Sequence, residues 1–276
     1  MDQPKSIQYK IKTVFRPALF LIGGFILISW LFFTPPGILG KADAVGYAVC
    51  HRIDSRSLHI GVRQLPLCVR CTGQYIGAVT GLLFLTIFAK RRSGMPPRRV
   101  IGVMIFFFLL YAIDGLNSYF YLPPFLVMFP NMPHLYEPSN TLRLFTGTGM
   151  GLVISMLIYP AFLGSIQTNP DTRPSISNLK TCFIILALGI LVDLLILTES
   201  IYFLLPVGLI SAGGVIILLT MVYTVLLLRI YRKENQFTRL SQISWYVAGG
   251  FIITITQIAL FDMIRFIITG SWSGFI

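Results

Sequence analysis

The chain has few charged residues. Charged side chains make up 12% of its 276 residues, and only ten residues are acidic; a soluble domain usually carries about twice that charged fraction. Hydrophobic residues make up 55% of the chain, and the mean hydropathy is +0.78. Several apolar runs approach the length of about 20 residues that a helix needs to cross a bilayer. The sequence therefore predicts an all-α integral membrane protein.

The chain also lacks a motif for binding nucleic acid, although its net charge is +12. In membrane proteins, basic residues gather on cytoplasmic loops, and this tendency accounts for the charge. We therefore expect no nucleic-acid partner. The expected partners are the lipid bilayer itself and a lipid or quinone dissolved in it.

No internal repeat or low-complexity segment divides the chain, which predicts one membrane domain over residues 1–276. An uncleaved first helix is expected, because the small residues at 42–44 lie about ten positions beyond the first apolar run, too far for signal cleavage. We expect about seven membrane-spanning helices, at roughly residues 17–34, 72–89, 100–118, 142–163, 181–198, 203–229 and 245–268.

Alternate connecting segments carry most of the basic residues. Fifteen of the twenty-two lie in the N-terminal tail and in residues 90–99, 167–180 and 229–239. The positive-inside rule then places the N-terminus in the cytoplasm and, with seven spans, the C-terminus outside. The turn around Glu199 is very short, so its flanking spans are either two helices or one re-entrant element.

Cysteine is scarce, but three of the four cysteines lie between residues 50 and 71, in an outer segment that leads into the second span. Cys68 and Cys71 form a C-x-x-C after Pro66, at the expected start of that helix. The positive end of a helix lowers the pKa of a thiol. We expect Cys68, Cys71 and Tyr75 to share one face of the helix, while glycines at positions 73, 77 and 81 pack another helix on a different face.

Three uses of these cysteines remain open at this point. A structural disulfide leaves one of the three unpaired, because Cys182 lies at the opposite end of the fifth span. A zinc-type site takes Cys50, Cys68 and Cys71 as ligands, with His51, His59, a carboxylate or water in the fourth position. Thiol redox chemistry is the third use, with Cys68 and Cys71 as the reacting pair.

Polar residues within the spans lie in the outer half of the membrane, where unpaired charges are costly. Arg143 is close enough in the predicted topology to pair with Asp114 or Glu137, and Asp262 with Arg265 three residues later. These groups either tie helices together as structural ion pairs or line a polar cavity open to the outside. Whether the protein is an enzyme is left open by the sequence. Its expected catalytic residues are Asp114, Glu137 and Arg143.

Arginines in the outer segment depart from the positive-inside trend. Arg52, Arg56, Arg63 and Arg70 either tolerate the position or recognise an anion beside the cysteines. The expected substrate-binding residues are Arg52, Arg56, Arg70, Tyr75, Asn117 and Asn140. Asn140 is also a plausible helix N-cap.

Two family resemblances bear on this segment. "CVRCTGQY" is similar to the quinone-side motif of the vitamin K epoxide reductase family, which implies a quinone-linked thiol oxidoreductase. "CHRIDSRS", "LPLCVRCTGQYIG", "DGLNSY" and "LYEPSNTLRLFTG" together resemble an uncharacterised prokaryotic membrane-protein family, domain of unknown function 2085. That resemblance covers about residues 45–155, implies a prokaryotic plasma membrane and brings no reaction with it. The matching residues are Cys50, His51, Arg52, Arg56, Ser57, Cys68, Arg70, Cys71, Gly73 and Tyr75.

These observations favour a membrane protein with an extracytoplasmic polar site capped by a zinc-like centre of Cys50, Cys68, Cys71 and His51. Such a centre would act on a lipid or an amphiphilic anion. The alternatives are the quinone-linked oxidoreductase and a transporter or structural subunit with a disulfide-stapled loop.

The predicted topology can be tested with single cysteines introduced between Lys90 and Arg99 in intact cells. We expect them to resist a membrane-impermeant thiol reagent until the membrane is opened, because this segment is cytoplasmic. Labelling from outside would contradict the predicted orientation of the chain in the membrane.

Overall fold

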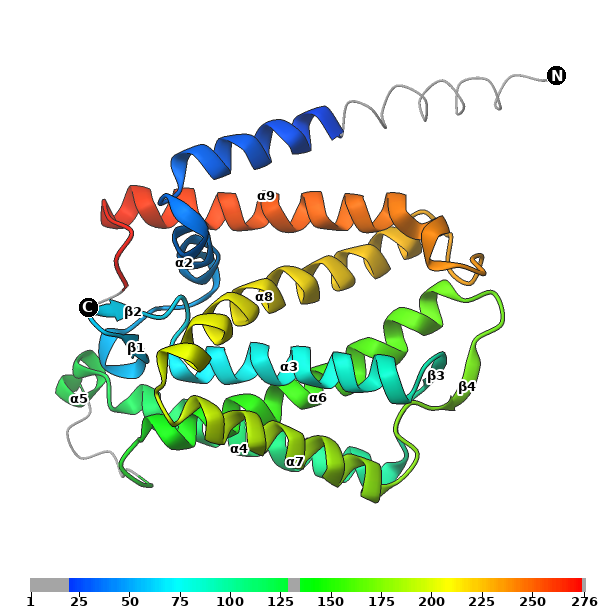
Figure 1. Cartoon of the computed structure of the whole chain (residues 1–276), viewed down its shortest axis with the longest axis horizontal. Coiled ribbons are helices and arrows are strands. Elements are labelled where there is room, and N and C mark those ends of the chain that lie inside the picture. Colours follow the sequence, from blue (N-terminus) through cyan, green and yellow to red (C-terminus); the bar gives the residue numbers. More distant parts are fainter. Residues whose placement is uncertain (1–19, 129–134, 275–276) are drawn as a thin grey trace.

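The structure of the chain is a computed structural model that describes residues 20–128 and 135–274. The basic N-terminal tail, on which the predicted orientation partly rests, lies outside these ranges. Six helices in the described part are long and apolar enough to cross a membrane, and Figure 1 shows them as one bundle. They are α3 (Val69–Phe88), α4 (Arg98–Phe120), α6 (Asn140–Ile166), α7 (Leu179–Ile196), α8 (Ile201–Ile230) and α9 (Ser244–Thr269).

The first predicted span differs from the expectation. The helix Phe20–Phe33 is followed by α2 (Gly37–Val49), and the two are bent by 110°. The described part of the first helix covers about 21 Å at 1.5 Å per residue. The Lys41 ammonium stabilises the bend, because it donates to the carbonyl oxygens of Leu31 and Thr34 at the end of the first helix. The bent pair supplies the seventh span only if its two helices count as one.

The two helices around Glu199 are separate. Helix α7 ends at Ile196 and α8 begins at Ile201, and Glu199 adopts a positive φ of 53° in the turn between them. The structure therefore resolves the alternative that the sequence left open.

Short elements lie at the two ends of the bundle. At one end, β1 (His59–Ile60) and β2 (Arg63–Gln64) form an antiparallel hairpin in which Ile60 pairs with Arg63. At the other end, β3 (Arg92–Gly94) pairs in parallel with β4 (Asp171–Pro174). The remaining short helices are η1 (Asp54–Arg56), α5 (Pro123–Met128) and η2 (Leu240–Ile243).

Helices α3 and α6 pack with their backbones in direct contact. A Cβ atom on Gly77 would lie 2.4 Å from the carbonyl oxygen of Thr148, and one on Gly151 would lie 2.0 Å from that of Gln74. Gly73 and Gly147 face the partner backbone in the same way. The small residues predicted to form a packing surface therefore meet one another.

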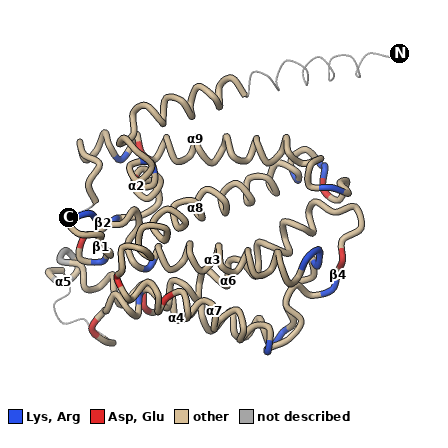
Figure 2. The backbone as a smooth tube through the Cα atoms, viewed as in Figure 1, with Lys and Arg blue, Asp and Glu red and all other residues tan. Residues whose placement is uncertain are grey.

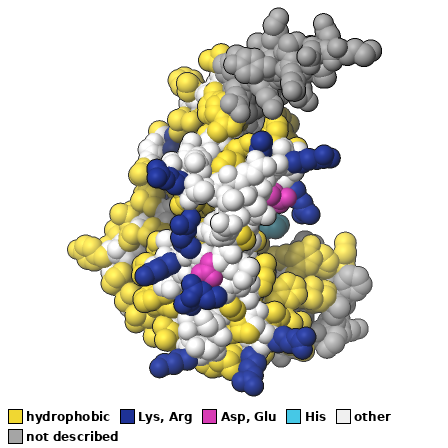
Figure 3. Space-filling model, turned by 90° about the vertical axis from the view of Figure 1, so that its right-hand side faces the viewer, with side chains coloured by type: hydrophobic (Ala, Val, Ile, Leu, Met, Phe, Trp, Pro, Cys, Tyr) yellow, Lys and Arg dark blue, Asp and Glu magenta, His cyan; other side chains and the backbone are white. Residues whose placement is uncertain are grey.

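The bundle has two chemically different ends. The segments that carry β3, β4 and η2 lie together at one end, where many Lys and Arg side chains gather (Figures 2 and 3). The hairpin β1–β2, α5 and the end of α9 lie at the other (Figure 1). The predicted alternation of basic segments is thus visible in the fold, whereas the side of the membrane that each end faces remains a prediction.

The α3–α6 contact leads to a stability prediction. Gly151→Val should lower the melting temperature of the purified protein, because its side chain would overlap the α3 backbone and force the helices apart at a cost of about 2 kcal/mol or more. Gly213→Ala in α8 is the matched control, since a Cβ there meets nothing within 4 Å. Equal melting temperatures for both variants would contradict a tight α3–α6 contact.

Candidate functional site

Three cysteines meet at the end of the bundle that carries the β1–β2 hairpin. Cys50 follows the last residue of α2, Cys68 is the residue before α3, and Cys71 lies in the first turn of α3. The Sγ atoms of Cys50 and Cys68 are 3.2 Å apart, and all three sulfurs lie within 4.8 Å of one another. Cys50 is buried and the other two are half-buried. The sequence prediction that these three residues form one cluster is therefore confirmed.

Local packing explains why α2 brings Cys50 to the start of α3. A Cβ on Gly46 would lie 1.8 Å from the carbonyl oxygen of Pro66, so only glycine allows this approach. The chain then turns at Arg52, whose φ is 53°. This turn directs the Arg52 N–H toward the Cys50 sulfur at 3.4 Å, and the Cys68 N–H donates to the same sulfur at 3.4 Å.

The three thiols are not equivalent. Hydrogen bonds with Cys68 and then Cys71 hold the pKa of Cys50 well below its usual range, and the two backbone N–H groups act in the same direction. The pKa of Cys68 is raised, chiefly through its hydrogen bond with Cys50. Cys50 is thus the sulfur that the surroundings stabilise as a thiolate.

Arg265 of α9 holds the cysteine-bearing segment in place. Its guanidinium donates to the carbonyl oxygens of Tyr47 at 2.5 Å, Cys50 at 2.6 Å and His51 at 3.0 Å. It also lies over the Tyr47 ring, 3.9 Å from the centroid. Arg265 and Asp262 do not form the predicted direct ion pair and attract each other only over a longer distance. The guanidinium donates to three backbone acceptors, and Asp262 accepts a hydrogen bond from Trp30 at 2.8 Å.

Two further arginines near the cysteines form ion pairs with Asp43 of α2. Arg52 and Arg63 both pair with this carboxylate, at 3.1 and 2.6 Å. Arg52 also donates to the carbonyl oxygen of Trp272, which follows α9. Sequence reasoning did not find Asp43, because α2 itself was not predicted; the run of small and apolar residues "GILGKADAVGYAV" is the only signal for it.

The two histidines near the cysteines are placed differently. His51 is exposed and is not one of the three clustered residues, although it lines a cavity of about 260 Å³ together with Cys50 and Arg265. His59, considered as a fourth ligand, has its Nε2 atom 2.9 Å from Asp54. The role of His51 as a ligand stays a prediction.

A second polar network surrounds Asp114 of α4. This carboxylate is 1% exposed and accepts from Arg70 Nε and Nη2 at 2.9 and 2.5 Å. Thr146 of α6 donates to the same oxygen at 3.1 Å, and the Tyr136 hydroxyl donates to the other at 2.9 Å. Arg70 also donates to Ser118 at 2.7 Å. The network ties α3, α4 and α6 together next to Cys71.

Arg143 does not form the ion pair that the sequence suggested. It donates to Asn140 at 2.8 Å, because Arg70 occupies the carboxylate of Asp114. Glu137 is exposed and lies outside this network. The N-cap of α6 is Ser139, whose hydroxyl accepts from the N–H of Leu142, rather than Asn140.

The remaining predicted binding residues make structural contacts. Arg56 donates to the carbonyl oxygen of Ser118 at 2.9 Å. Asn117 donates to the carbonyl oxygen of Tyr136 at 2.9 Å. Tyr75 packs with Cys68 and Cys71 against the cluster that contains Cys50, on the face of α3 away from the glycines, as predicted. Whether any of these residues binds a substrate stays a prediction.

Comparison with known proteins identifies the segment that carries this centre. Residues 50–157 match the family described as "Predicted membrane protein (DUF2085)". This match confirms the resemblance to the domain of unknown function 2085 family. Together with the six apolar helices, it shows that the chain is a membrane protein. The matched segment begins at Cys50 and contains all three clustered cysteines and Asp114, whereas Arg265 and the whole of α2 lie outside it.

Two archaeal relatives are similar to parts of the chain. An uncharacterised protein of Methanocaldococcus jannaschii is 26% identical over 123 residues, which cover 45% of this chain and 69% of the relative. An uncharacterised protein of Methanothermobacter thermautotrophicus is 28% identical over 109 residues, or 40% of this chain and 83% of the relative. No solved structure matches the chain.

The Arg70–Asp114 pair can be tested by a double-mutant cycle. Arg70→Gln alone should destabilise the protein by about 3–5 kcal/mol, because it leaves a carboxylate uncompensated in the interior. Arg70→Gln with Asp114→Asn should be less destabilised than the sum of the single changes. Thermal unfolding of the purified variants measures this, and additive effects would show that the two groups act independently.

Proposed function

We propose that the protein binds a transition metal of the zinc class through Cys50, Cys68 and Cys71. The single observation that carries this proposal is that three thiols from two separate helices converge around Cys50, whose sulfur also accepts two backbone N–H groups. Backbone hydrogen bonds to sulfur are a common feature of metal–thiolate centres, because they delocalise the negative charge.

The spacing of the sulfurs suits such an ion. Zinc–sulfur bonds of about 2.3 Å in a tetrahedral site place the sulfurs about 3.8 Å apart. The Cys50 and Cys68 sulfurs are 3.2 Å apart and all three sulfurs lie within 4.8 Å, so binding needs the separations to change by at most about 1 Å. A disulfide would use two of the three sulfurs and leave the third without a role.

The surrounding charges support a metal–thiolate centre. Three thiolates and one divalent cation carry a net charge of −1, which burial alone would make unfavourable. The guanidinium of Arg265 donates to the carbonyl oxygen of Cys50, and the backbone N–H of Arg52 donates to the Cys50 sulfur. The Arg52 guanidinium itself is paired with Asp43. We infer that the Arg265 guanidinium balances the charge of the centre in addition to holding the cysteine-bearing segment.

The fourth coordination position is the place where chemistry would occur. The cavity of about 260 Å³ beside Cys50 is lined by His51, Arg265 and apolar residues of α9. It can accommodate the imidazole of His51, a water molecule or the anionic group of an amphiphile. We propose that an amphiphilic anion or lipid on the extracytoplasmic side is the substrate, held by arginine and polarised by the metal.

A second candidate function is oxidation of a cysteine pair by a quinone. The 3.2 Å separation of the Cys50 and Cys68 sulfurs favours it. In that reaction two thiols lose two electrons and two protons to form a disulfide, and the quinone takes up both to become a quinol. Mass spectrometry after alkylation would detect a Cys50–Cys68 disulfide that appears with quinone and disappears with a dithiol.

Elemental analysis tests the metal proposal. Protein purified from zinc-supplemented cells should contain about one zinc ion per chain, and Cys50→Ser, Cys68→Ser and Cys71→Ser should each lower the zinc content severalfold or more. Cys182→Ser is the matched control, because this buried cysteine belongs to α7 and lies at the other end of the bundle. The Cys182→Ser protein should therefore contain as much zinc as the wild type. Wild-type protein that contains no metal and has three freely alkylated thiols would contradict the proposal.

The same measurement on His51→Ala separates two forms of the site. Full zinc content in this variant would indicate that the fourth position is open to water or substrate. Loss comparable to that of the cysteine variants would indicate a closed site with four protein ligands.

A further inference from the structure

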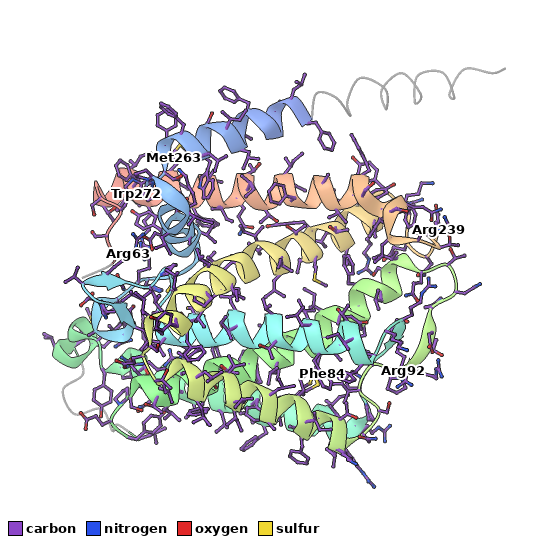
Figure 4. The ribbon with its side chains drawn as sticks, viewed as in Figure 1. Arg63, Phe84, Arg92, Arg239, Met263 and Trp272 are labelled. Atoms are coloured by element: carbon purple, nitrogen blue, oxygen red, sulfur yellow. The ribbon has the colours of Figure 1, made fainter. Side chains whose placement is uncertain are left out.

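A groove lies between the first helix and α9, outside the cysteine centre and the Asp114 network. It has a volume of about 530 Å³. Met263 of α9 and Trp272, which both line it, lie at the end of the bundle where α2 meets α9 (Figure 4). Its lining residues are Phe25, Ile26, Ser29, Trp30, Phe33, Thr34, Ala259, Asp262, Met263, Phe266, Ile267 and Trp272.

One of the lining residues is a buried carboxylate with an unpartnered oxygen. Asp262 is 2% exposed. Its Oδ2 atom accepts from the Trp30 indole at 2.8 Å, whereas its Oδ1 atom has no hydrogen-bond partner. Within residues 20–128 and 135–274, no cation lies within 4 Å of this carboxylate as an ion pair, although the Arg265 guanidinium on the same helix attracts it from a longer distance. A buried polar atom without a partner is unfavourable by itself, so Oδ1 marks the position of a missing donor.

The walls of the groove indicate the charge of that donor. Five of the lining residues are aromatic: Phe25, Trp30, Phe33, Phe266 and Trp272. The faces of aromatic rings attract cations, and tryptophan does so most strongly. A carboxylate surrounded by aromatic rings favours a positively charged donor over a neutral hydroxyl, because both the carboxylate and the rings stabilise the charge.

The rim of the groove is apolar and exposed. Phe25 and Phe33 are 72% and 74% exposed, and Ile267 is 74% exposed. These side chains belong to helices of a membrane protein, so their exposed surface meets hydrocarbon chains. An apolar molecule can therefore enter laterally and leave its tail between the two helices.

We propose that this groove binds a cationic amphiphile, namely an amine carried on an apolar body. Its ammonium group donates to Oδ1 of Asp262 beside the ring of Trp30, and its apolar part lies along the first helix and α9. This site is separate from the metal centre, and its occupancy does not depend on whether Cys50, Cys68 and Cys71 bind a metal.

Photolabelling of the full chain in a neutral maltoside detergent tests the site. The probe is dodecylamine with a diazirine in its chain, and dodecanol with the same diazirine is the neutral comparison. Mass spectrometry should find amine-dependent label on peptides of the first helix and α9. Unlabelled dodecylamine should compete at concentrations about tenfold or more below those of dodecanol, because a charge-assisted hydrogen bond distinguishes them.

Asp262→Asn is the decisive variant. It keeps an acceptor for Trp30 but turns an N–H₂ group toward the groove, so the affinity for the amine should fall about tenfold or more. Asp193→Asn is the matched control. Asp193 is 1% exposed and, like Asp262, has one unpartnered oxygen, but it accepts a hydrogen bond from Thr148 on α6 and does not line the groove. This control should bind the amine as the wild type does.

Ser29→Phe provides a second variant if Asp262→Asn folds poorly. It narrows the groove and leaves the carboxylate in place, so amine labelling should also decrease. Melting temperature confirms folding of each variant. Equal amine affinity in the wild type and Asp262→Asn, equal affinity for amine and alcohol, or label outside these two helices would overturn the proposal.

Discussion

Four glycines bring the backbones of α3 and α6 into direct contact, and this contact fixes the direction in which the rest of α3 points. With one face pressed against α6, the opposite face turns Cys71 and Tyr75 toward α2 and α8. A larger side chain at Gly77 or Gly151 would separate the helices and move the first turn of α3 away from Cys50. The geometry of the cysteine centre therefore depends on a packing contact that contains no sulfur.

Arginine organises the end of the bundle that carries the cysteines. Arg265 holds the carbonyl oxygens around Cys50, Arg52 joins α2 to the chain after α9, and Arg70 ties α3 to α4 through Asp114. A guanidinium can serve several acceptors at once because it has five N–H donors in a rigid plane. This explains how a basic segment on the predicted outer side is used for structure as well as for charge.

Three buried carboxylates are stabilised to different degrees. Asp114 has a cation and hydroxyl donors for both oxygens, whereas Asp193 and Asp262 each keep one oxygen without a partner. Sequence reasoning grouped such residues by their expected depth in the membrane and did not identify their partners. The hydrogen bond between Trp30 and Asp262, which lie 232 positions apart in the sequence, depends on which helices become neighbours.

The sequence by itself determined the membrane class, six long helices, the packing role of the glycines and the grouping of three cysteines, because hydropathy, residue size and spacing along one helix are local properties. Only the tertiary structure decided the break after Phe33, the helix that delivers Asp43 and Cys50, and the partner of each charged group. Those features depend on the contact between α2 and the start of α3 and on the position of α9. A linear pattern cannot specify such long-range contacts, since several pairings satisfy the same charges and only packing selects among them.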